Sequence, residues 1–517
     1  MAEQIALVTK VVSGTGDVDF TDPSITESFT AAILVFSAVP SGSDGTDDPG
    51  AILGYGFLSS ERNAGVTGDV SMCWFAQNGQ NTSPNAGYRN STNRCVSVVD
   101  TGGTGTLTVG AVYVSDQPGG FRVNFSTFTL ASVKVTAVII AGAQRGSADT
   151  CGVPTTSSSE PVGGTTTYEP DVLILAGTDQ AVGVDASSNL VGAAPTLGFA
   201  VNDGSDTQVC AFISCDDGTE PSDADGAIRS NRGCAEISTS RVFSGGIFTF
   251  TSSGFDRITD NGPLNARYLA LQFTPNRVRQ ACANLAVSAS TGVQSWSNFG
   301  FVPDLVFGCG TLLSAVDAAL EDGAKAGAFG IFISGRFGSR AWTWHTEEGL
   351  TLAGAVVANS HTRQEDVGLL MYDHQGNVVW RATWAGSTGG GSWGLDFSTA
   401  SQAGFLTVWG LQLIPAPHLP VRRTRRQRRT RARIQRRPVL VGGRPVGSPP
   451  LTRGFWKAVQ RIRRALRARL RRQLAPFYGV RTTGETTDEG SKGRTFTPGM
   501  RRGNIVGPGV SPSDPDQ

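Results

Sequence analysis

The chain is poor in histidine, in methionine and in long apolar runs. Its 517 residues include 4 His and 4 Met, and no stretch reaches the ~18 consecutive apolar residues that a membrane-spanning helix needs. Residues 1–20 lack a basic segment followed by an apolar core, so we expect no secretory leader, and we expect synthesis in a cytoplasm, where disulfides are not assumed. Four histidines also leave little material for metal cages or histidine-based catalysis. The composition therefore argues against an enzyme.

Motifs for metals and phosphates are missing as well. The eight cysteines form no CxxC pair, and the Gly-rich stretch 102–110 is not followed by GK[ST], so we expect no metal and no cofactor. The acidic stretch 216–225 lacks the ligand spacing of an EF-hand and is better explained as a solvated turn. Asp44, Asp47 and Asp48 receive the same interpretation.

Short runs of β-branched and aromatic residues, separated by Gly, Asn, Asp and Ser, fill residues 1–415. Such runs are typical of strands, and sustained helical periodicity is absent there. Five elements also recur in the same order three times, beginning with FTAAILVF (29–36), YEPDVLIL (168–175) and FVPDLVF (301–307). The sequence therefore predicts an all-β fold with three tandem β-sandwich domains of the jelly-roll type.

The repeat sets the predicted boundaries. They are repeat 1 (1–142), a linker (143–167), repeat 2 (168–275), a linker (276–297), repeat 3 (298–415), an Arg-rich extended segment (416–450), a basic amphipathic helix (451–476) and a flexible tail (477–517). Around the second linker, residues 274–289 could carry a short helix.

Two cysteine pairs follow the first two repeats. Cys73 and Cys95 are 22 residues apart, Cys210 and Cys234 are 24 apart, and the third repeat lacks both members. Paired presence and absence indicates neighbouring positions in space. Two alternatives stay open, a disulfide in each repeat or two buried thiols that behave as small apolar side chains.

Tryptophan is concentrated in the third repeat, which holds six of the nine Trp. Exposed indoles supply large contact areas, so these residues could form a face that binds sugars or a protein. The competing interpretation, which we favour, is that they fill the core of the domain. The candidates for a ligand face are Trp342, Trp344, Trp380 and Trp384.

The net charge of +1 is an average over two different regions. Residues 421–517 hold 25 of the 44 Lys+Arg and 5 of the 43 Asp+Glu, which gives +20 there and −19 in residues 1–420. Ten arginines lie between 421 and 437 without an acid. Such a block stays solvated until it meets negative charge on nucleic acid, protein or membrane. Its first arginines are Arg422, Arg423, Arg425, Arg426, Arg428 and Arg429.

Beyond a Pro/Gly-rich hinge, residues 453–474 show helical periodicity. The predicted apolar stripe consists of Phe455, Val459, Ile462, Leu466 and Leu470, and the other faces carry Arg461, Arg463, Arg464 and Arg467. This helix could lie on an anionic membrane, dock on a protein partner or pack on its own body. Because the body is acidic, the last two are favoured.

The repeat resembles a family of virion structural proteins of tailed bacteriophages and prophages. Its hallmarks are an aromatic-x-Pro-[DK]-hydrophobic first strand and a late GF…YLAL segment. The matching residues are Tyr168, Pro170 and Asp171, then Phe301, Pro303 and Asp304, then Gly254, Phe255 and Tyr268 to Leu271. The first repeat has Ala31 and Ala32 where Pro and Asp would stand. The resemblance covers residues 1–415 and implies a non-enzymatic component of a phage particle.

Three functional hypotheses follow. The first is a structural protein of the virion, in the tail, a fibre or the head surface, made in the bacterial cytoplasm, forming a homo-oligomer and anchored to other virion proteins by the Arg-rich arm. The second is an array of modules that bind host glycans through the Trp face. The third is a capsid protein whose arm neutralises nucleic acid.

Overall fold

The computed structural model divides into two units, residues 1–418 and 419–517, which are described separately. The described residues are 3–37, 44–45, 48–49, 51–62, 68–76, 86–99, 106–163, 167–178, 186–188, 195–215, 224–237, 243–261, 264–322, 327–352, 355–373, 376–415, 440–441 and 444–445. In the second unit they comprise one antiparallel pair, β34 (Leu440–Val441) and β35 (Arg444–Pro445). The predicted arm and helix otherwise lie outside the described residues.

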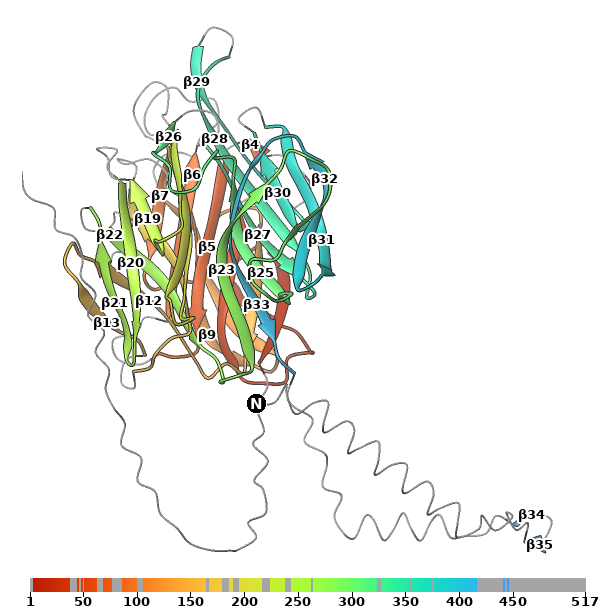
Figure 1. The fold of residues 1–517 in the computed structure, drawn as a ribbon. Helices are drawn as coiled ribbons and strands as arrows, with labels where there is room; N and C mark the ends of the chain where they lie inside the picture. The colour runs from red at the N-terminus through yellow and green to blue at the C-terminus, as the bar shows by residue number, and fades with distance from the viewer. Residues whose placement is uncertain are drawn as a thin grey trace, which may run out of the picture. The chain divides into compact units, whose positions relative to one another are not determined.

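The first unit is built from three successive sets of eleven strands (Figure 1). Domain 1 contains β1 (Gln4–Val12), β2 (Gly16–Thr21), β3 (Phe29–Ser37), β4 (Asp48–Pro49), β5 (Ala51–Ser59), β6 (Asp69–Ala76), β7 (Ala86–Ser91), β8 (Val96–Val99), β9 (Leu107–Gln117), β10 (Gly120–Phe128) and β11 (Val133–Ala141). Domain 2 contains β12 (Arg145–Val153), β13 (Ser158–Pro161), β14 (Val172–Thr178), β15 (Ala186–Ser188), β16 (Thr196–Val201), β17 (Thr207–Cys215), β18 (Ala224–Arg229), β19 (Cys234–Ile237), β20 (Phe243–Thr251), β21 (Gly254–Thr259) and β22 (Leu264–Gln272). Domain 3 contains β23 (Val278–Val287), β24 (Gly292–Trp296), β25 (Leu305–Thr311), β26 (Glu321–Asp322), β27 (Ala328–Gly335), β28 (Arg340–Leu352), β29 (Ala355–Glu365), β30 (Leu369–Tyr372), β31 (Val378–Gly389), β32 (Ser392–Ala400) and β33 (Gly404–Leu413).

All three domains share one antiparallel topology. Domain 1 has a large sheet in the order β1-β11-β3-β5-β6-β7 and a small sheet in the order β2-β10-β9-β8. Domain 2 repeats this with β12-β22-β14-β16-β17-β18 and β13-β21-β20-β19, and domain 3 with β23-β33-β25-β27-β28-β29 and β24-β32-β31-β30. The described residues contain no helix in this unit. For the described residues, the prediction of an all-β fold with three tandem β-sandwich domains is confirmed.

The two kinds of sheet differ in their sequence pattern. In β3 all nine residues are buried, in the run FTAAILVFS, because one face meets the small sheet and the other meets the neighbouring domains. In β10 the side chains alternate, with Phe121 and Val123 buried and Arg122 and Asn124 only partly buried. A continuous apolar run therefore marks a strand that is covered on both sides, and alternation marks one that faces solvent on one side.

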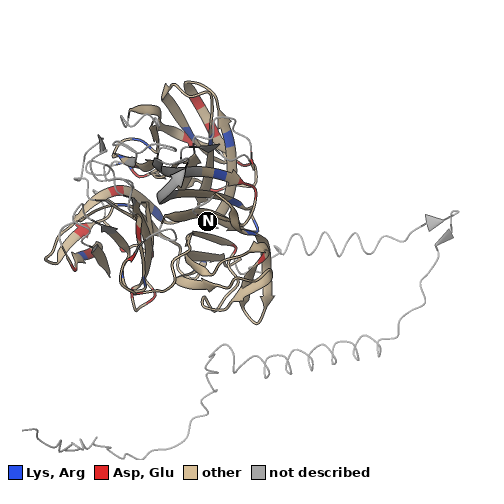
Figure 2. Cartoon of the chain, turned by 90° about the horizontal axis from the view of Figure 1, so that it is seen from above, with Lys and Arg blue, Asp and Glu red and all other residues tan. Residues whose placement is uncertain are grey.

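The large sheets of the three domains share one apolar core. Ile33 and Tyr55 of domain 1, Phe199 of domain 2, and Phe307 and Trp342 of domain 3 all belong to it. The rings of Phe199 and Phe307 meet edge to face at 5.9 Å, and the Tyr55 hydroxyl donates a hydrogen bond to the carbonyl of Thr196. Figure 2, viewed from above, shows the three sandwiches arranged around a common centre. The block is therefore pseudo-threefold.

A short strand passes from each domain into the large sheet of another. β4 of domain 1 pairs with β29 of domain 3, β26 of domain 3 pairs with β18 of domain 2, and β15 of domain 2 pairs with β7 of domain 1. Each of these exchanged strands lies in the equivalent loop of its domain, before β5, β27 and β16. The three exchanges close a ring, which makes the large sheets seven-stranded.

The residues predicted to be linkers turn out to be strands. Residues 145–153 and 158–161 form β12 and β13, the opening strands of domain 2, and residues 278–287 and 292–296 form β23 and β24. No helix begins at residue 274. β12 and β23 each pair along their whole length with the last strand of their domain, β22 and β33. Their polar sequences misled the prediction because they are edge strands, each with one partner in its sheet.

Candidate functional site

Two features unite the three domains and supply the candidate site: the exchanged strands, and the end of the block where the chain passes between domains. We call that second region the connection end and define it by Glu3 and residues 142–144, 273–277 and 414–415. The loops that carry the exchanged strands follow β3, β14 and β25. By the direction of these strands, the loops lie at the end of the block opposite to the connection end.

The junction between domains 1 and 3 is ionic. The Asp44 carboxylate accepts hydrogen bonds from the Arg340 guanidinium and from Lys134 Nζ, the latter at 2.7 Å. Arg340 is 2% exposed and also contacts Asp366, which is 72% exposed. Partial burial opposes ionisation of Asp44, yet hydrogen bonds from Arg340 and Lys134 hold its pKa below the usual value. Asp44 lies in an exposed turn, as predicted, and its carboxylate is also an inter-domain anchor, which the sequence did not indicate.

The equivalent junction between domains 3 and 2 is described by hydrogen bonds and apolar contact. The Asp317 amide donates to the Ile228 carbonyl at 2.9 Å, and the Ser230 amide donates to Asp317 Oδ1 at 2.9 Å. Leu313 is fully buried in the shared core, and its methyl groups lie 3.0 and 3.1 Å from where a Cβ on Gly226 would stand. Hydrogen bonds and apolar contact stabilise this junction, whereas ion pairs of Asp44 stabilise the junction between domains 1 and 3.

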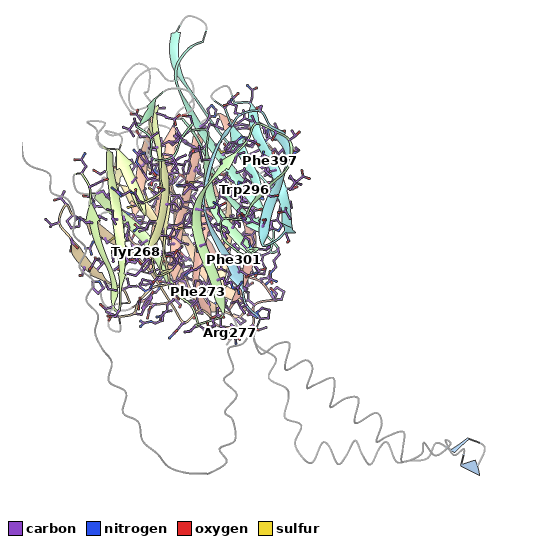
Figure 3. The ribbon with its side chains drawn as sticks, viewed as in Figure 1. Tyr268, Phe273, Arg277, Trp296, Phe301 and Phe397 are labelled. Atoms are coloured by element: carbon purple, nitrogen blue, oxygen red, sulfur yellow. The ribbon has the colours of Figure 1, made fainter. Side chains whose placement is uncertain are left out.

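The connection end brings distant parts of the chain together. The Thr274 amide donates to Glu3 Oε1 at 2.9 Å, and the Ile414 amide donates to the Arg277 carbonyl at 2.7 Å. Figure 3 shows Phe273 and Arg277 at the lower end of the block, the end at which the N-terminus lies in Figure 1. Both ends of the three-domain block therefore lie at the same pole.

A repeated aspartate clamps the last strand where it leaves a domain. Asp171 Oδ2 accepts from the Phe273 amide at 2.6 Å, and Asp304 Oδ2 accepts from the Leu413 amide at 2.7 Å. Burial raises the pKa of Asp171, an effect that the bond from Phe273 opposes. The Pro-Asp pattern of repeats 2 and 3 thus has a structural role, since it fixes the point at which the chain continues.

The first repeat has Thr30 at the clamp position. In each domain, the residue that follows β5, β16 or β27 donates its backbone amide to an equivalent carbonyl. Ser60 donates to Thr30, Asn202 donates to Asp171, and Arg336 donates to Asp304. The counterpart of Asp171 is therefore Thr30, two residues earlier than the sequence alignment placed it at Ala32.

The same register shows that the two cysteine pairs do not occupy equivalent positions in their domains. By this register, Gly56 in β5 is the counterpart of Gly198 in β16. Cys210 pairs with Gly198, whereas Cys73 pairs with Gly54, two residues before that counterpart. Cys73 and Cys210 thus occupy different positions, and their similar spacing is a coincidence of loop length. Cys73, Cys95, Cys210 and Cys234 are all reduced and buried. Burial raises the pKa of Cys73 to about 12 and that of Cys95 well above its usual value. The buried-thiol alternative describes them.

Three of the four candidate Trp residues are fully buried. Trp342 and Trp344 lie in the shared central core, and Trp380 lies inside the domain 3 sandwich. Trp384 is partly buried and stacks on Trp393 at 5.6 Å. The Trp face predicted as a ligand site is therefore not exposed, and the core interpretation is correct for Trp342, Trp344 and Trp380. Glycine makes room for these rings, since a Cβ on Gly404 would stand 2.8 Å from the Trp380 ring.

One catalytic pattern that sequence reasoning missed is the pentapeptide GGSWG at 390–394, which matches G-x-S-x-G. A nucleophile elbow requires a strand, a sharp turn and a helix. Here the pentapeptide spans the hairpin turn between β31 and β32, with Trp393 buried in the sandwich core. This Ser392 therefore lacks the setting of a catalytic nucleophile.

The remaining candidate sites concern metals, membranes and the basic arm. Within the described ranges, no three His, Cys, Asp or Glu side chains gather as a metal site would require, and no helix there could cross a bilayer. The predicted anion-binding arginines and the apolar stripe of residues 453–474 lie outside the described residues, so they stay predictions.

Comparison with known proteins adds no relative. No family model, no curated protein and no solved structure matches this chain.

Proposed function

We propose that the protein is a structural component of a tailed-bacteriophage particle, placed in the tail, a fibre or the head surface and held there by its Arg-rich arm. The observation that carries the proposal is the closed ring of exchanged strands around one shared core. A ring of this kind makes a rigid block out of three sandwiches, and the chain continues from its connection end into a segment of net charge +20. A rigid block with a basic tether suits a building element of an assembly.

The finer parts of this proposal rest on sequence. They are the jelly-roll type of the sandwiches, the helix at 451–476, the virion location and the contacts with other virion proteins. The resemblance of repeats 2 and 3 to phage structural proteins supports the virion location and the sandwich type, and the aspartate clamp gives the shared Pro-Asp pattern a structural reason. The helix rests on the helical periodicity of residues 453–474 alone.

Purified particles of the phage that encodes this chain provide the test. We expect mass spectrometry to detect the protein in particles banded on a density gradient, and cryo-electron microscopy to place a three-lobed density on them. A variant that ends at residue 415 should fold and be missing from the particles. Absence of the full-length protein from purified particles would refute the proposal.

The glycan-binding alternative loses the feature that suggested it, because Trp342, Trp344 and Trp380 are buried. Host-glycan binding by the full chain, abolished by Trp384→Ala, would restore it. The nucleic-acid alternative keeps its main support, the separation of charge along the chain.

A further inference from the structure

Two of the three junctions in the ring are also joined directly by the chain. Residues 142–144 connect domain 1 to domain 2, and residues 273–277 connect domain 2 to domain 3. Because a chain spans at most about 3.6 Å per residue, these connections let the strands that they join separate by no more than roughly 14 and 22 Å. Domains 1 and 3 are joined only through the whole of domain 2. The junction between domains 1 and 3 is therefore closed by noncovalent contacts without a short tether.

Several segments of domain 1 contribute to the contacts that close this junction. The hydroxyl of the fully buried Ser37, at the end of β3, donates to Gln364 Oε1 at 3.3 Å. On β1, a methyl group of Leu7 lies 3.1 Å from where a Cβ on Gly338 would stand. The loop after β3 adds the ion pair of Asp44 with domain 3. Two strands and one loop of domain 1 thus meet domain 3 along the junction.

The other two junctions have comparable buried contacts. At the junction between domains 1 and 2, Oγ of the fully buried Ser59 accepts a hydrogen bond from the Ala148 amide at 3.1 Å. At the junction between domains 2 and 3, the buried Cys282 thiol donates to the Thr207 carbonyl at 3.3 Å. Each junction therefore contains a small buried side chain that bonds to the neighbouring domain. The clear difference between the junctions is the tether.

A short tether favours a closed junction. It keeps the two partner surfaces at a high effective concentration after they part, and it limits the conformational freedom that parting can gain. The junction between domains 1 and 3 lacks this contribution. We propose that this junction is a built-in opening line, at which domains 1 and 3 separate as units while the other two junctions stay closed. The ion pair of Asp44 with Arg340 holds it shut, and the block opens there without unfolding. Such an opening does not depend on the virion location.

Thiol labelling of the full native chain tests the opening, because a buried thiol reacts only while it is exposed. Ser37→Cys places a probe at the junction between domains 1 and 3. Ser59→Cys places the matched probe at the junction between domains 1 and 2, and the native Cys282 reports on the third junction. Peptide mass spectrometry after timed exposure to a maleimide resolves each position. We expect position 37 to be labelled at least about tenfold faster than position 59 and Cys282.

Loss of the ion pair should open this junction selectively. Asp44→Ala should raise the labelling rate at position 37 by about a hundredfold. It should also raise the labelling rate of a Leu7→Cys thiol, because the opening exposes β1 and the end of β3 together. The rates at position 59 and at Cys282 should stay within about twofold of those without Asp44→Ala.

Three outcomes would overturn the opening line. Equal labelling rates at the three junctions would show that the tether makes no difference. An effect of Asp44→Ala shared by all probes would show that the block opens only by global unfolding, and faster labelling at position 37 without position 7 would show fraying of β3 alone. Circular dichroism and the unfolding midpoint show whether each variant is folded, and Asp44→Asn replaces Asp44→Ala if the alanine variant does not fold.

Discussion

The junctions of domain 3 with its two neighbours have the same backbone arrangement and different chemistry. Domain 1 reaches domain 3 through Asp44 and the buried Arg340, whereas domain 3 reaches domain 2 through hydrogen bonds of the Asp317 amide and carboxylate and through the apolar Leu313. Both junctions also carry an exchanged strand that pairs over two residues. The two junctions thus share the exchanged strand and differ in their side-chain contacts. The ring depends on the shared topology, and different side-chain contacts can stabilise it.

The largest effect should come from breaking the ionic junction. Asp44→Ala leaves the buried Lys134 without its carboxylate and the buried Arg340 with only the exposed Asp366, and a buried charge that loses its partner costs about 3 kcal/mol. Chemical denaturation of the purified block should show this loss. Asp366→Ala removes only the exposed partner of Arg340 and should cost less than about 1 kcal/mol. Equal losses in the two variants would show that Asp44 does not anchor the junction.

The apolar junction should lose slightly less. Leu313→Ala removes a fully buried side chain from the shared core, which costs about 2–3 kcal/mol through lost burial and the cavity that remains. Leu313→Met keeps most of the volume and should cost under about 1.5 kcal/mol. The free energy of unfolding from urea titration separates the two. A loss under 0.5 kcal/mol for the alanine variant, which is about the scatter of surface substitutions, would place Leu313 outside the core.

A close backbone approach inside one domain should be next in size. A Cβ on Gly198 would stand 1.9 Å from the Gly233 carbonyl oxygen, so Gly198→Ala must push two chain segments apart, at a cost of roughly 1–3 kcal/mol. Gly204→Ala is the control for a glycine with open space around it, although its positive φ adds some strain. The thermal midpoint of each variant provides the measurement. Gly198→Ala should melt lower than Gly204→Ala, and the reverse order would contradict the packing.

Acid should weaken the ionic junction and spare the apolar one. The folded-state pKa of Asp44 is depressed, so its contribution to stability is present above its unfolded pKa of about 3.9 and is lost as the pH falls through the lower folded value. The difference in unfolding free energy between the wild type and Asp44→Asn should therefore shrink below about pH 4. The corresponding difference for Leu313→Ala should not change with pH. A constant Asp44→Asn difference down to pH 2 would refute this.

The smallest effect should come from reducing agents. The seven cysteines whose burial is described are reduced and buried, and burial raises the pKa of Cys73 to about 12, so little thiolate is present at neutral pH. The melting temperature should not change when a reductant is added. Titration with a thiol reagent should label these seven cysteines only after denaturation, and rapid labelling of the native protein would contradict their burial.

Much of the fold was predictable from local pattern. The continuous apolar runs and the turn residues around them predict the core strands, and their recurrence predicts three sandwiches. The edge strands β12 and β23 were missed because an edge strand has one partner in its sheet and can carry polar residues such as Arg145, Asp149 and Arg279. The alignment of repeats 1 and 2 also slipped by two residues, because Ala32 fits the apolar run as well as Thr30 does.

Most of the candidate site could not be predicted from the sequence. Asp44 precedes a turn-like stretch that ends in Pro49 and looks solvated, and its partner Arg340 lies 296 residues later, so their pairing depends on the closed ring. The burial of Trp342, Trp344 and Trp380 depends on residues from distant parts of the chain, so the sequence could favour the core and could not fix it. The aspartate clamp was visible as a motif, yet its role as the chain exit became clear only from the Leu413 and Phe273 amides.

The exchange of β4 has a consequence for how the protein is made. Pro49 pairs with His361, so the partner strand of β4 is synthesised 312 residues after it. At about 5–20 residues per second, the ribosome needs roughly 15–60 s to supply that strand. During this interval the face of domain 1 that contains Ile33 and Tyr55 has no complete cover. The nascent chain must therefore pass through a stage with exposed apolar surface, which makes it a natural client for chaperones and ties the yield of folded protein to the pace of translation.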